Sequence, residues 1–540
     1  MLRYFISIIA LALSLTAGAQ ERNRPAMDDE VVTQWQKLNQ VYRYLSGWYV
    51  DDVDMKPLVE SAIREMLAEL DPHSAYLDAE QTEDARESLD GEFSGIGVEF
   101  NVLRDTIIVV NTIVGSPAEA VGMRANDRIV RIDTTNAVGI RRNDVPKHLR
   151  GPRGSTVEVS VVRRGEEQPL EFRITRDNIP VNTVSASYMA YKQIGYIKID
   201  RFGRTTFREF ADAFGRLKDD GAKSLVLDLR GNGGGLMDAA IEVAGFFLPR
   251  ESTIVTTEGR AIEPRRYTAR DGGNFTNGGV VVMIDESSAS SSEIVAGALQ
   301  DWDRAVVIGR PSFGKGLVQR QVSLPDGSAM RITVARYHTP SGRVIQRPYE
   351  KGHRKEYYAA HRERFTNVND SLTVDSTAPT YKTKVFGRTV YGGGGIRPDE
   401  LVALDTTAMP QYMINLIMRG AIRDYTLQYL DTHRAELSAA YPNFESFDAG
   451  FSVTDEMLEE LSAVGEEAGV TRDAQGILES KHLISLQIKA LTAQRLFSTS
   501  EFYRVMNADD TGGRWLSRAV EILRDWKSLG KPILQGKSKH

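Results

Sequence analysis

The stretch LVLDLRGNGGGLMDAAIEVAGFFL, residues 225–248, decides the fold. It begins with a continuous apolar run, typical of a strand buried on both faces, passes through a glycine-rich loop and ends in a helical pattern. A second unit of the same order follows, with a strand at 279–284, a serine-rich loop at 287–292 and a helix at 293–299. Open α/β sheets carry their sites where such loops meet at one sheet edge, so we expect the chemistry there.

The composition is that of a soluble globular protein, with 41% hydrophobic and 26% charged residues, and 540 residues suggest about three to four domains. Sixty-seven Lys and Arg against 73 Asp and Glu give a net charge of −6. This balance argues against a nucleic-acid partner, which a strongly basic field would attract. Because the chain has no cysteine, disulfides, thiolate metal sites and a cysteine nucleophile are excluded.

Residues 1–19, MLRYFISIIALALSLTAGA, have the pattern of a secretory signal peptide. One early cation at Arg3 precedes an apolar run at 4–15 and a small-residue ending, which predicts cleavage before Gln20. An uncleaved anchor is the alternative. The run is short for a bilayer span, and no later stretch approaches eighteen apolar residues, so we expect no membrane span after signal removal. The predicted localisation is export, most simply to the periplasm.

Four regions follow the signal peptide. Residues 20–88 carry two apolar stripes that predict two packed helices, and residues 89–178 change to short strands punctuated by glycine and proline. The α/β core takes up 179–400 and includes a polar stretch at about 348–383, which we expect to be a solvated insertion. Residues 401–540 are helix-patterned. Their apolar stripes are expected to form core, or a face for a homo-oligomer or an adaptor.

The β-rich region resembles a PDZ domain. The resemblance depends on the loop SGIGV at 94–98 and on SPAEAVGMRANDRIVRID at 116–133. It implies that backbone N–H groups of Gly95, Ile96, Gly97 and Val98 bind the C-terminal carboxylate of a peptide, which adds a strand to the sheet edge. The alternative is that the two glycines only form a turn in an ordinary β-barrel.

The serine-rich loop has two interpretations. Ser290 with Glu293 three residues later forms a capping box, and the same helix N-terminus favours developing negative charge on a serine nucleophile. No histidine falls between Ile179 and Tyr337, which makes a Ser-His-Asp arrangement less favoured. Lys315, flanked by glycines, is the better local base. It must be neutral to act, so its pKa must fall by roughly two to three units; burial would lower it and an adjacent carboxylate would oppose this.

Two stretches resemble cofactor-binding motifs, but both are incomplete. The stretch GRPSFGKG at 309–316 nearly matches a phosphate-binding loop, but Gly316 replaces the hydroxyl residue that holds magnesium, and a strand-like segment follows. GNGGGL at 231–236 lacks the third glycine of a dinucleotide-binding loop. No metal-ligand cluster is visible. We therefore expect neither cofactor nor metal.

Four segments together resemble the carboxyl-terminal processing peptidases, also called tail-specific proteases, over about 28–399. They are LDPHSAYL at 70–77, DLRGNGGGL at 228–236, SSASSSEIVAGALQDWDRAVVIGRPSFGKGLVQ at 287–319 and RYHTPSGR at 336–343. The resemblance implies a multidomain α/β protein: N-terminal helices, a β-rich PDZ domain, an α/β peptidase core of the crotonase/Clp-like kind and a helical C-terminal region.

The resemblance also implies site residues. Ser290 matches the nucleophile, Lys315 the base and Gln319 the residue that orients the base. The implied oxyanion hole uses the backbone N–H of Ser291 and the glycine loop, here Gly235 with Gly234 as neighbour. Ser291 stands where the family usually has alanine, so the choice among four neighbouring serines (Ser288, Ser290, Ser291 and Ser292) depends on alignment.

The function implied is that of an exported serine endopeptidase that cleaves proteins near their C-termini through an acyl-enzyme. Its partners would be proteins or peptides with apolar C-termini, and the PDZ domain would engage the substrate tail or gate the site. The alternative is a catalytically silent PDZ scaffold that binds peptide C-termini.

Overall fold

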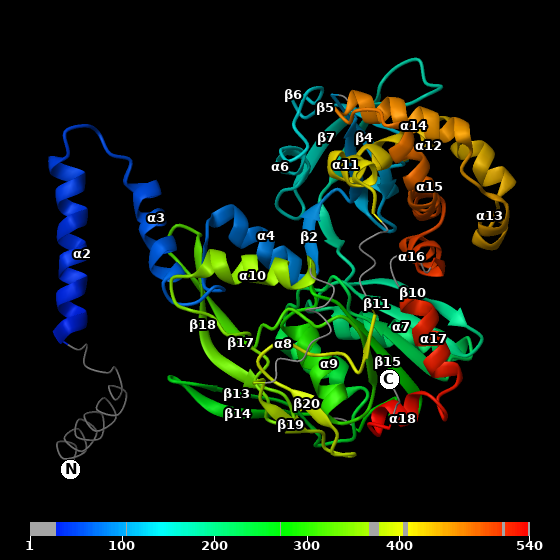
Figure 1. Cartoon of the computed structure of the whole chain (residues 1–540). Helices are drawn as coiled ribbons and strands as arrows, with labels where there is room; N and C mark the ends of the chain where they lie inside the picture. Colours follow the sequence, from blue (N-terminus) through cyan, green and yellow to red (C-terminus); the bar gives the residue numbers. More distant parts are fainter. Residues whose placement is uncertain are drawn as a thin grey trace, which may run out of the picture. The chain divides into compact units, whose positions relative to one another are not determined.

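The computed structural model of the chain describes residues 29–103, 105–270, 272–366, 377–402, 409–509 and 514–537 (Figure 1). The chain divides into two compact units, Met1–Met66 and Leu67–His540. The predicted signal peptide and its cleavage site lie outside the described residues. In the described part, no helix combines the length and the apolar character that crossing a membrane requires.

The N-terminal unit contains the predicted helix α2 (Asp29–Trp48) and most of the second, α3 (Met55–Ala68), whose last two residues belong to the other unit. The expectation that they bury their apolar stripes is wrong for α2, whereas α3 buries Leu67 of its stripe. No residue of α2 is buried, and Trp35 on its stripe is 60% exposed. The described part of this unit has no third element that would cover these faces.

The PDZ region is an antiparallel sheet closed by two short helices, α5 (Pro117–Ala120) and α6 (Val145–Leu149). In spatial order its strands are β3 (Val98–Leu103), β4 (Thr106–Thr112), β5 (Arg128–Ile132), β7 (Thr156–Val162) and β8 (Leu170–Thr175), with β6 (Thr135–Asn136) beside β5. The strand β2 (Glu92–Gly95) pairs with β9 (Asp177–Pro180), so the entry and exit of this region lie together. Alternate residues such as Val157, Val159 and Val161 fill the core, as the period of two requires.

The central sheet of the peptidase core confirms the predicted α/β class. In spatial order its strands are β10 (Val184–Tyr191), β11 (Ile194–Ile199), β12 (Ser224–Asp228), β15 (Gly279–Ile284), β16 (Val306–Gly309) and β21 (Glu400–Leu401). The strand β10 runs antiparallel to β11, and all the other pairs are parallel. The two predicted strand–loop–helix units therefore end at the same edge.

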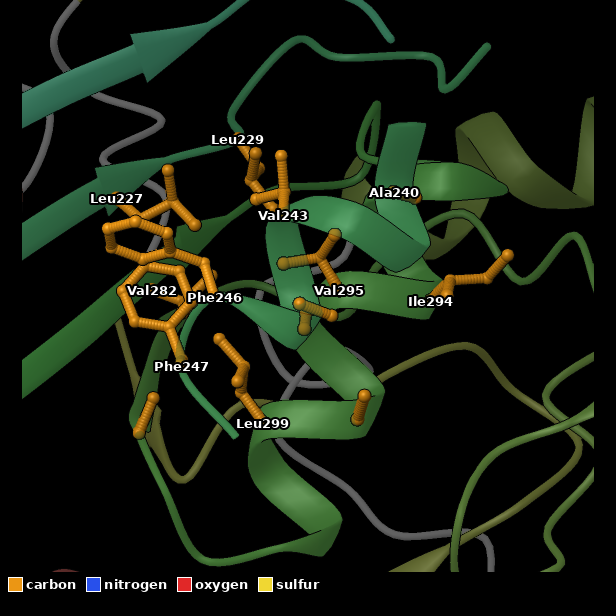
Figure 2. Packing of buried hydrophobic residues seen from close by; sticks show 14 of the residues in the cluster. Leu227, Leu229, Ala240, Val243, Phe246, Phe247, Val282, Ile294, Val295 and Leu299 are labelled. Atoms are coloured by element: carbon orange, nitrogen blue, oxygen red, sulfur yellow. The ribbon is translucent and has the colours of Figure 1, made fainter. Parts of the chain in front are cut away.

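Helices cover both faces of this sheet, which explains the continuous apolar run. One face packs on α7 (Thr206–Asp219), α8 (Met237–Gly245) and α9 (Ser291–Asp301). Figure 2 shows Leu227 and Val282 on this face among side chains of α8 and α9. The other face, with Val226 and Val281, packs on α17 (Trp515–Arg524) and α18 (Gly530–Leu534). These C-terminal stripes are therefore part of the peptidase core.

A second sheet brings a distant segment to the lysine loop. Its strands are β1 (Ala75–Leu77), β18 (Ala329–His338), β13 (Thr253–Gly259) and β14 (Ile262–Thr268), with β17 (Leu317–Ser323) also paired to β18. Because β1 and β17 share β18, residues 70–77 lie near the site. The helix α4 (Ala79–Asp90) follows β1, and a small hairpin is formed by β19 (Thr380–Lys382) and β20 (Thr389–Tyr391).

The predicted solvated insertion needs correction. Residues 367–376 lie outside the described part, but the preceding residues form α10 (Arg354–Thr366). Tyr357 on this helix is buried, and the centroid of its ring lies 5.4 Å from that of the His73 ring. The aromatic residues of this stretch therefore pack against the structure, although most of their sequence neighbours are polar.

The remaining C-terminal helices have a core of their own, around Leu416, Phe447 and Ile488. They are α11 (Gln411–Arg419), α12 (Ala421–Ala440), α13 (Phe444–Gly450), α14 (Asp455–Glu467), α15 (Ala474–Leu496) and α16 (Thr499–Ala508). Polar pairs connect this group to the PDZ strands: Asn101 with Asp424 at 3.0 Å, Arg128 with Asp431 at 2.7 Å, and Glu99 with Arg495 at 2.8 Å.

Candidate active site

Ser290 occupies an unusual turn at the start of α9. Its backbone has φ 54° and ψ −110°, a conformation that residues other than glycine rarely adopt and that clusters at functional sites. The carboxylate of Glu293 accepts a hydrogen bond from the Ser290 N–H at 2.8 Å, which is the predicted capping contact. The turn leaves the Ser290 side chain partly exposed at the sheet edge.

Hydrogen bonding separates the four neighbouring serines. Ser288, Ser291 and Ser292 are buried, and each hydroxyl donates to a backbone carbonyl of the neighbouring strand and glycine loop. The acceptors are Leu229 at 2.8 Å, Gly235 at 3.0 Å and Asn232 at 2.9 Å, respectively. The Ser290 hydroxyl donates to no residue in the described part of the chain. It is therefore the one of the four available to react.

Glu293 connects the serine turn to the lysine loop. Its side chain is fully buried, and besides Ser290 its carboxylate accepts from the N–H groups of Gly314 at 2.7 Å and Lys315 at 2.9 Å and from the Ser312 hydroxyl at 2.5 Å. Burial raises the pKa of Glu293, while these hydrogen bonds act in the opposite direction. One carboxylate thus fixes the spacing of both loops.

The Lys315 amine is held by an amide. It donates to Gln319 Oε1 at 2.8 Å, and Gln319 Nε2 in turn donates to the carbonyl of His73 at 2.7 Å. Burial, followed by the nearby charge of Arg331, lowers the pKa of Lys315 to about 8, while the charges of Glu293 and Asp71 oppose the shift. The size of the change lies within the expected two to three units, and carboxylates oppose it as expected.

The contribution of His73 was missed in the sequence. Burial, with the Lys315 charge next, lowers the pKa of its ring to about 3, so the imidazole is neutral near pH 7. Its backbone carbonyl, rather than its ring, holds Gln319. The Asp71 carboxylate fixes this turn by accepting from the N–H groups of His73 at 2.8 Å and Ser74 at 2.9 Å. The only signal was the family-like segment at 70–77, which gave no hint of this contact.

The predicted oxyanion donors divide into two kinds. The N–H groups of Gly235 and Ser291 donate to no described residue, and both residues line the site cavity. The N–H of Gly234 already donates to Asn232 Oδ1 at 2.8 Å, so the prediction of this group as a donor is corrected. Gly234 matters for space: a Cβ there would lie 2.8 Å from the Ala289 carbonyl oxygen.

One cavity of about 550 Å³ brings the predicted groups together. Ser290, Lys315 and Gln319 line it beside the two candidate N–H donors. In this structure the amine donates to Gln319 and not to the serine hydroxyl. Apolar side chains form much of the wall: Leu236, Met237, Ile294, Leu317 and Val318. Such walls exclude water and keep a buried amine poorly solvated.

The predicted peptide-binding loop lies in a different part of the molecule. Gly95 ends β2, Val98 begins β3, and the Ile96 side chain is buried in the PDZ core. The Gly97 carbonyl accepts from the Ile113 N–H at 2.9 Å and from the Ser116 hydroxyl at 3.0 Å. The strand β3 is at the end of its sheet, so one of its edges pairs with no described strand.

Within the described residues, no group of three or more His, Asp or Glu side chains is arranged to hold a metal ion.

Comparison with known proteins places this arrangement in a family. A family model described as Peptidase family S41 matches residues 193–352, and a PDZ domain model matches 94–174. The chain is 38% identical over 348 residues to the carboxy-terminal-processing protease of Bartonella bacilliformis, an alignment covering 64% of this chain and 79% of that protein. The chain belongs to the carboxy-terminal processing proteases. This protease therefore has a PDZ domain, an S41 peptidase core and a helical C-terminal region.

Further relatives, a solved structure and two more family models also match parts of this protease. The carboxy-terminal processing protease CtpB of Bacillus subtilis is 35% identical over 342 residues, covering 62% of this chain and 69% of that one. The solved photosystem II D1 C-terminal processing protease is 33% identical and covers 58% of this chain and 84% of its own, with a TM-score of 0.34. Residues 10–81 match a model described as the activating protease CtpB N-terminal domain, and residues 412–498 match a family of unknown function, DUF8443.

Proposed function

We propose that this protease cleaves peptide bonds by Ser/Lys acyl transfer, with Ser290 as nucleophile and Lys315 as general base. The neutral amine takes the hydroxyl proton, and the serine oxygen attacks the scissile carbonyl carbon. When the C–N bond breaks, the lysine ammonium gives its proton to the leaving amine. The restored amine then deprotonates a water that hydrolyses the ester and releases Ser290.

One observation carries this proposal: among the four neighbouring serines, only Ser290 combines exposure to the cavity with a hydroxyl that donates to no described residue, and a lysine with a lowered pKa lines the same cavity. With a pKa of about 8, roughly one-tenth of Lys315 is neutral at about pH 7. Gln319 supports this state because its amide oxygen orients the amine without adding a negative charge.

The tetrahedral intermediate places a negative charge on the former carbonyl oxygen. In this proposal the N–H groups of Gly235 and Ser291 stabilise that charge, since neither has another partner among the described residues. The apolar walls favour an apolar side chain next to the scissile bond.

The PDZ domain is proposed to bind the substrate's C-terminal tail through the loop at 95–98 and the edge of β3 that pairs with no described strand. Export to the periplasm is proposed from residues 1–19. Cleavage of this signal peptide is tested by N-terminal sequencing of the mature protein. We expect a chain that begins at Gln20, and a chain that begins at Met1 would contradict cleavage.

The chemistry is tested with Ser290→Ala and Lys315→Ala. We expect each to lower the cleavage of an unfolded protein with an apolar tail by about 10³-fold or more, as removal of a nucleophile or base does. Intact mass measures the products, and thermal melting checks folding. Ser287→Ala is the matched control, because Ser287 is an exposed member of the same serine run.

Covalent labelling separates the enzyme from the silent scaffold. A phosphonate probe is expected to modify Ser290 in the native protein and nothing in Ser290→Ala. Retained turnover in either catalytic variant overturns the assignment. Peptide binding by the native protein without cleavage or labelling would instead support the scaffold.

A further inference from the structure

The C-terminal helix α17 reaches the bases of both catalytic loops. The ring of Trp515, the first residue of this helix, contacts two guanidinium groups. The guanidinium carbon of Arg230 is 4.9 Å from the ring centroid, and that of Arg310 is also 4.9 Å away. These distances are within the range of cation–π attraction.

The two arginines hold equivalent places in the two loops. Arg230 stands five residues before Gly235 (235 − 230 = 5), and Arg310 stands five residues before Lys315 (315 − 310 = 5). Each is also fixed by a carboxylate at the sheet edge, Arg230 by Asp228 at 2.6 Å and Arg310 by Glu286 at 2.7 Å. The indole therefore completes the support of both loops where they leave the sheet.

Two further contacts join the C-terminal helices to the same region of the sheet edge. Asn507 at the end of α16 accepts a hydrogen bond from Arg230 at 2.9 Å and donates to the Tyr188 hydroxyl at 3.0 Å. A Cβ on Gly309, directly before Arg310, would lie 2.7 Å from the Trp515 ring. The indole therefore packs directly against the end of β16, where the chain enters the lysine loop.

The helix that carries Trp515 is itself firmly placed. Leu516, Ala519 and Ile522 are buried in the core cluster that includes strands of the central sheet. Arg518 adds an ion pair to Glu400 on β21, at 3.0 Å between Nη2 and Oε2. Movement of the indole relative to the sheet would disturb these contacts.

We propose that Trp515, with Asn507, is a positioning residue of the protease, which holds the glycine loop and the lysine loop at the separation that catalysis needs. The C-terminal helices lie outside the matched peptidase residues 193–352, and by this proposal they are a working part of the active site. The proposal rests on the proposed function for the identity of the reacting groups. A displacement of about 1 Å at such loops can lower turnover by about 10²-fold.

The test compares Trp515→Leu, Trp515→Phe and Trp526→Leu in the full chain. Leucine keeps an apolar side chain but removes the π face, whereas phenylalanine restores the face. We expect Trp515→Leu to lower kcat by about tenfold or more with KM changed less than threefold, and Trp515→Phe to recover most of it. Trp526, which packs in the same core cluster, is the control and should leave kcat within about threefold.

Asn507→Ala replaces no core side chain but removes the hydrogen bonds to Arg230 and Tyr188, and it should lower kcat about threefold or more with only a small change in melting temperature. Wild-type kcat in folded Trp515→Leu and in Asn507→Ala overturns the proposal, as does an equal loss in Trp526→Leu. The rate at which the phosphonate probe labels Ser290 should fall in parallel with kcat. Failure of the proposed function is seen separately, because Ser290→Ala would then remain active.

Discussion

Two glycine-rich loops of this protease use the same residue for different physical reasons. In the peptidase core, Gly234 leaves room for the serine turn, and the neighbouring Gly235 N–H donates to no described residue. In the PDZ domain, a Cβ on Gly97 would lie 2.2 Å from the Ser116 Cβ, and the Gly97 carbonyl already accepts two hydrogen bonds. The first loop keeps a place for a reacting group, and the second packs on its own domain. A glycine pattern in a sequence does not distinguish these uses.

The largest expected effect comes from Gly234→Ala in comparison with Gly97→Ala. The methyl group at position 234 would clash with the Ala289 carbonyl oxygen and the Ser290 Cβ, so we expect kcat to fall about 10²-fold or more while peptide binding persists. Gly97→Ala should weaken binding of a peptide about tenfold or more and leave the cleavage of a short reporter peptide nearly intact. Reporter turnover and fluorescence anisotropy of a labelled peptide measure the two losses.

Gly233→Ala is the matched control for the core loop, since an added Cβ meets no atom within 4 Å there. It should fold normally and keep turnover within about threefold. If Gly97→Ala abolished turnover of the short reporter, the two loops would not be independent and the comparison would be wrong.

A smaller effect is expected on the pH profile. Since only neutral Lys315 acts as a base and its pKa is about 8, kcat/KM should rise about tenfold per pH unit below about pH 8 and then level off. The Arg331 charge lowers that pKa, so Arg331→Gln should move the rise to higher pH and reduce activity most below about pH 8. Stopped assays from about pH 6 to 10 measure the shift.

Arg320→Gln tests whether the shift is specific, because Arg320 lies on the same hairpin but is exposed. It should leave the profile unchanged. A rise at the same pH in the native protein and in Arg331→Gln would show that Arg331 does not influence the base.

The smallest effect is expected where the PDZ strands meet the C-terminal helices. The Glu99 side chain is 55% exposed in its pair with Arg495, so solvent screens the attraction. Glu99→Gln should therefore change the free energy of unfolding by less than about 1 kcal/mol and leave kcat unaltered. A double-mutant cycle with Arg495→Gln, read by denaturant unfolding, measures the pair. A coupling above about 2 kcal/mol would place this contact among the strong supports of the fold.

The sequence was most informative where local pattern and burial agree. The run at 225–229 predicted a strand covered on both faces, and the structure covers it with α8 and α9 on one face and α17 on the other. The lowered pKa of Lys315 could be anticipated because its largest cause is burial, although the contribution of the Arg331 charge could not. Both features depend on short stretches of chain and on general physical chemistry.

Contacts between distant segments could not be anticipated. Nothing near His73 indicated that its carbonyl would hold Gln319, and a capping motif at Glu293 gave no sign that the same carboxylate would bind the lysine loop. The assignment of Gly234 as a donor failed for a related reason, since a glycine-rich string does not reveal that Asn232 takes one of its N–H groups. Tyr357 was expected in solvent because its neighbours are polar.

The helix that covers the second face of the central sheet arrives late in the chain. Trp515 begins α17 at 206 positions beyond the end of β16 (515 − 309 = 206), so Val226, Val281 and Val306 on that face have no cover until the C-terminal helices have been synthesised. Contacts of such long sequence separation form slowly, and an uncovered apolar sheet is prone to aggregate meanwhile. A chain that ends before this point would expose the apolar face of the sheet and would leave Arg230 and Arg310 without their contacts to Trp515. If Trp515 positions the two loops as proposed, the protease becomes active only after the last helices have docked on the sheet.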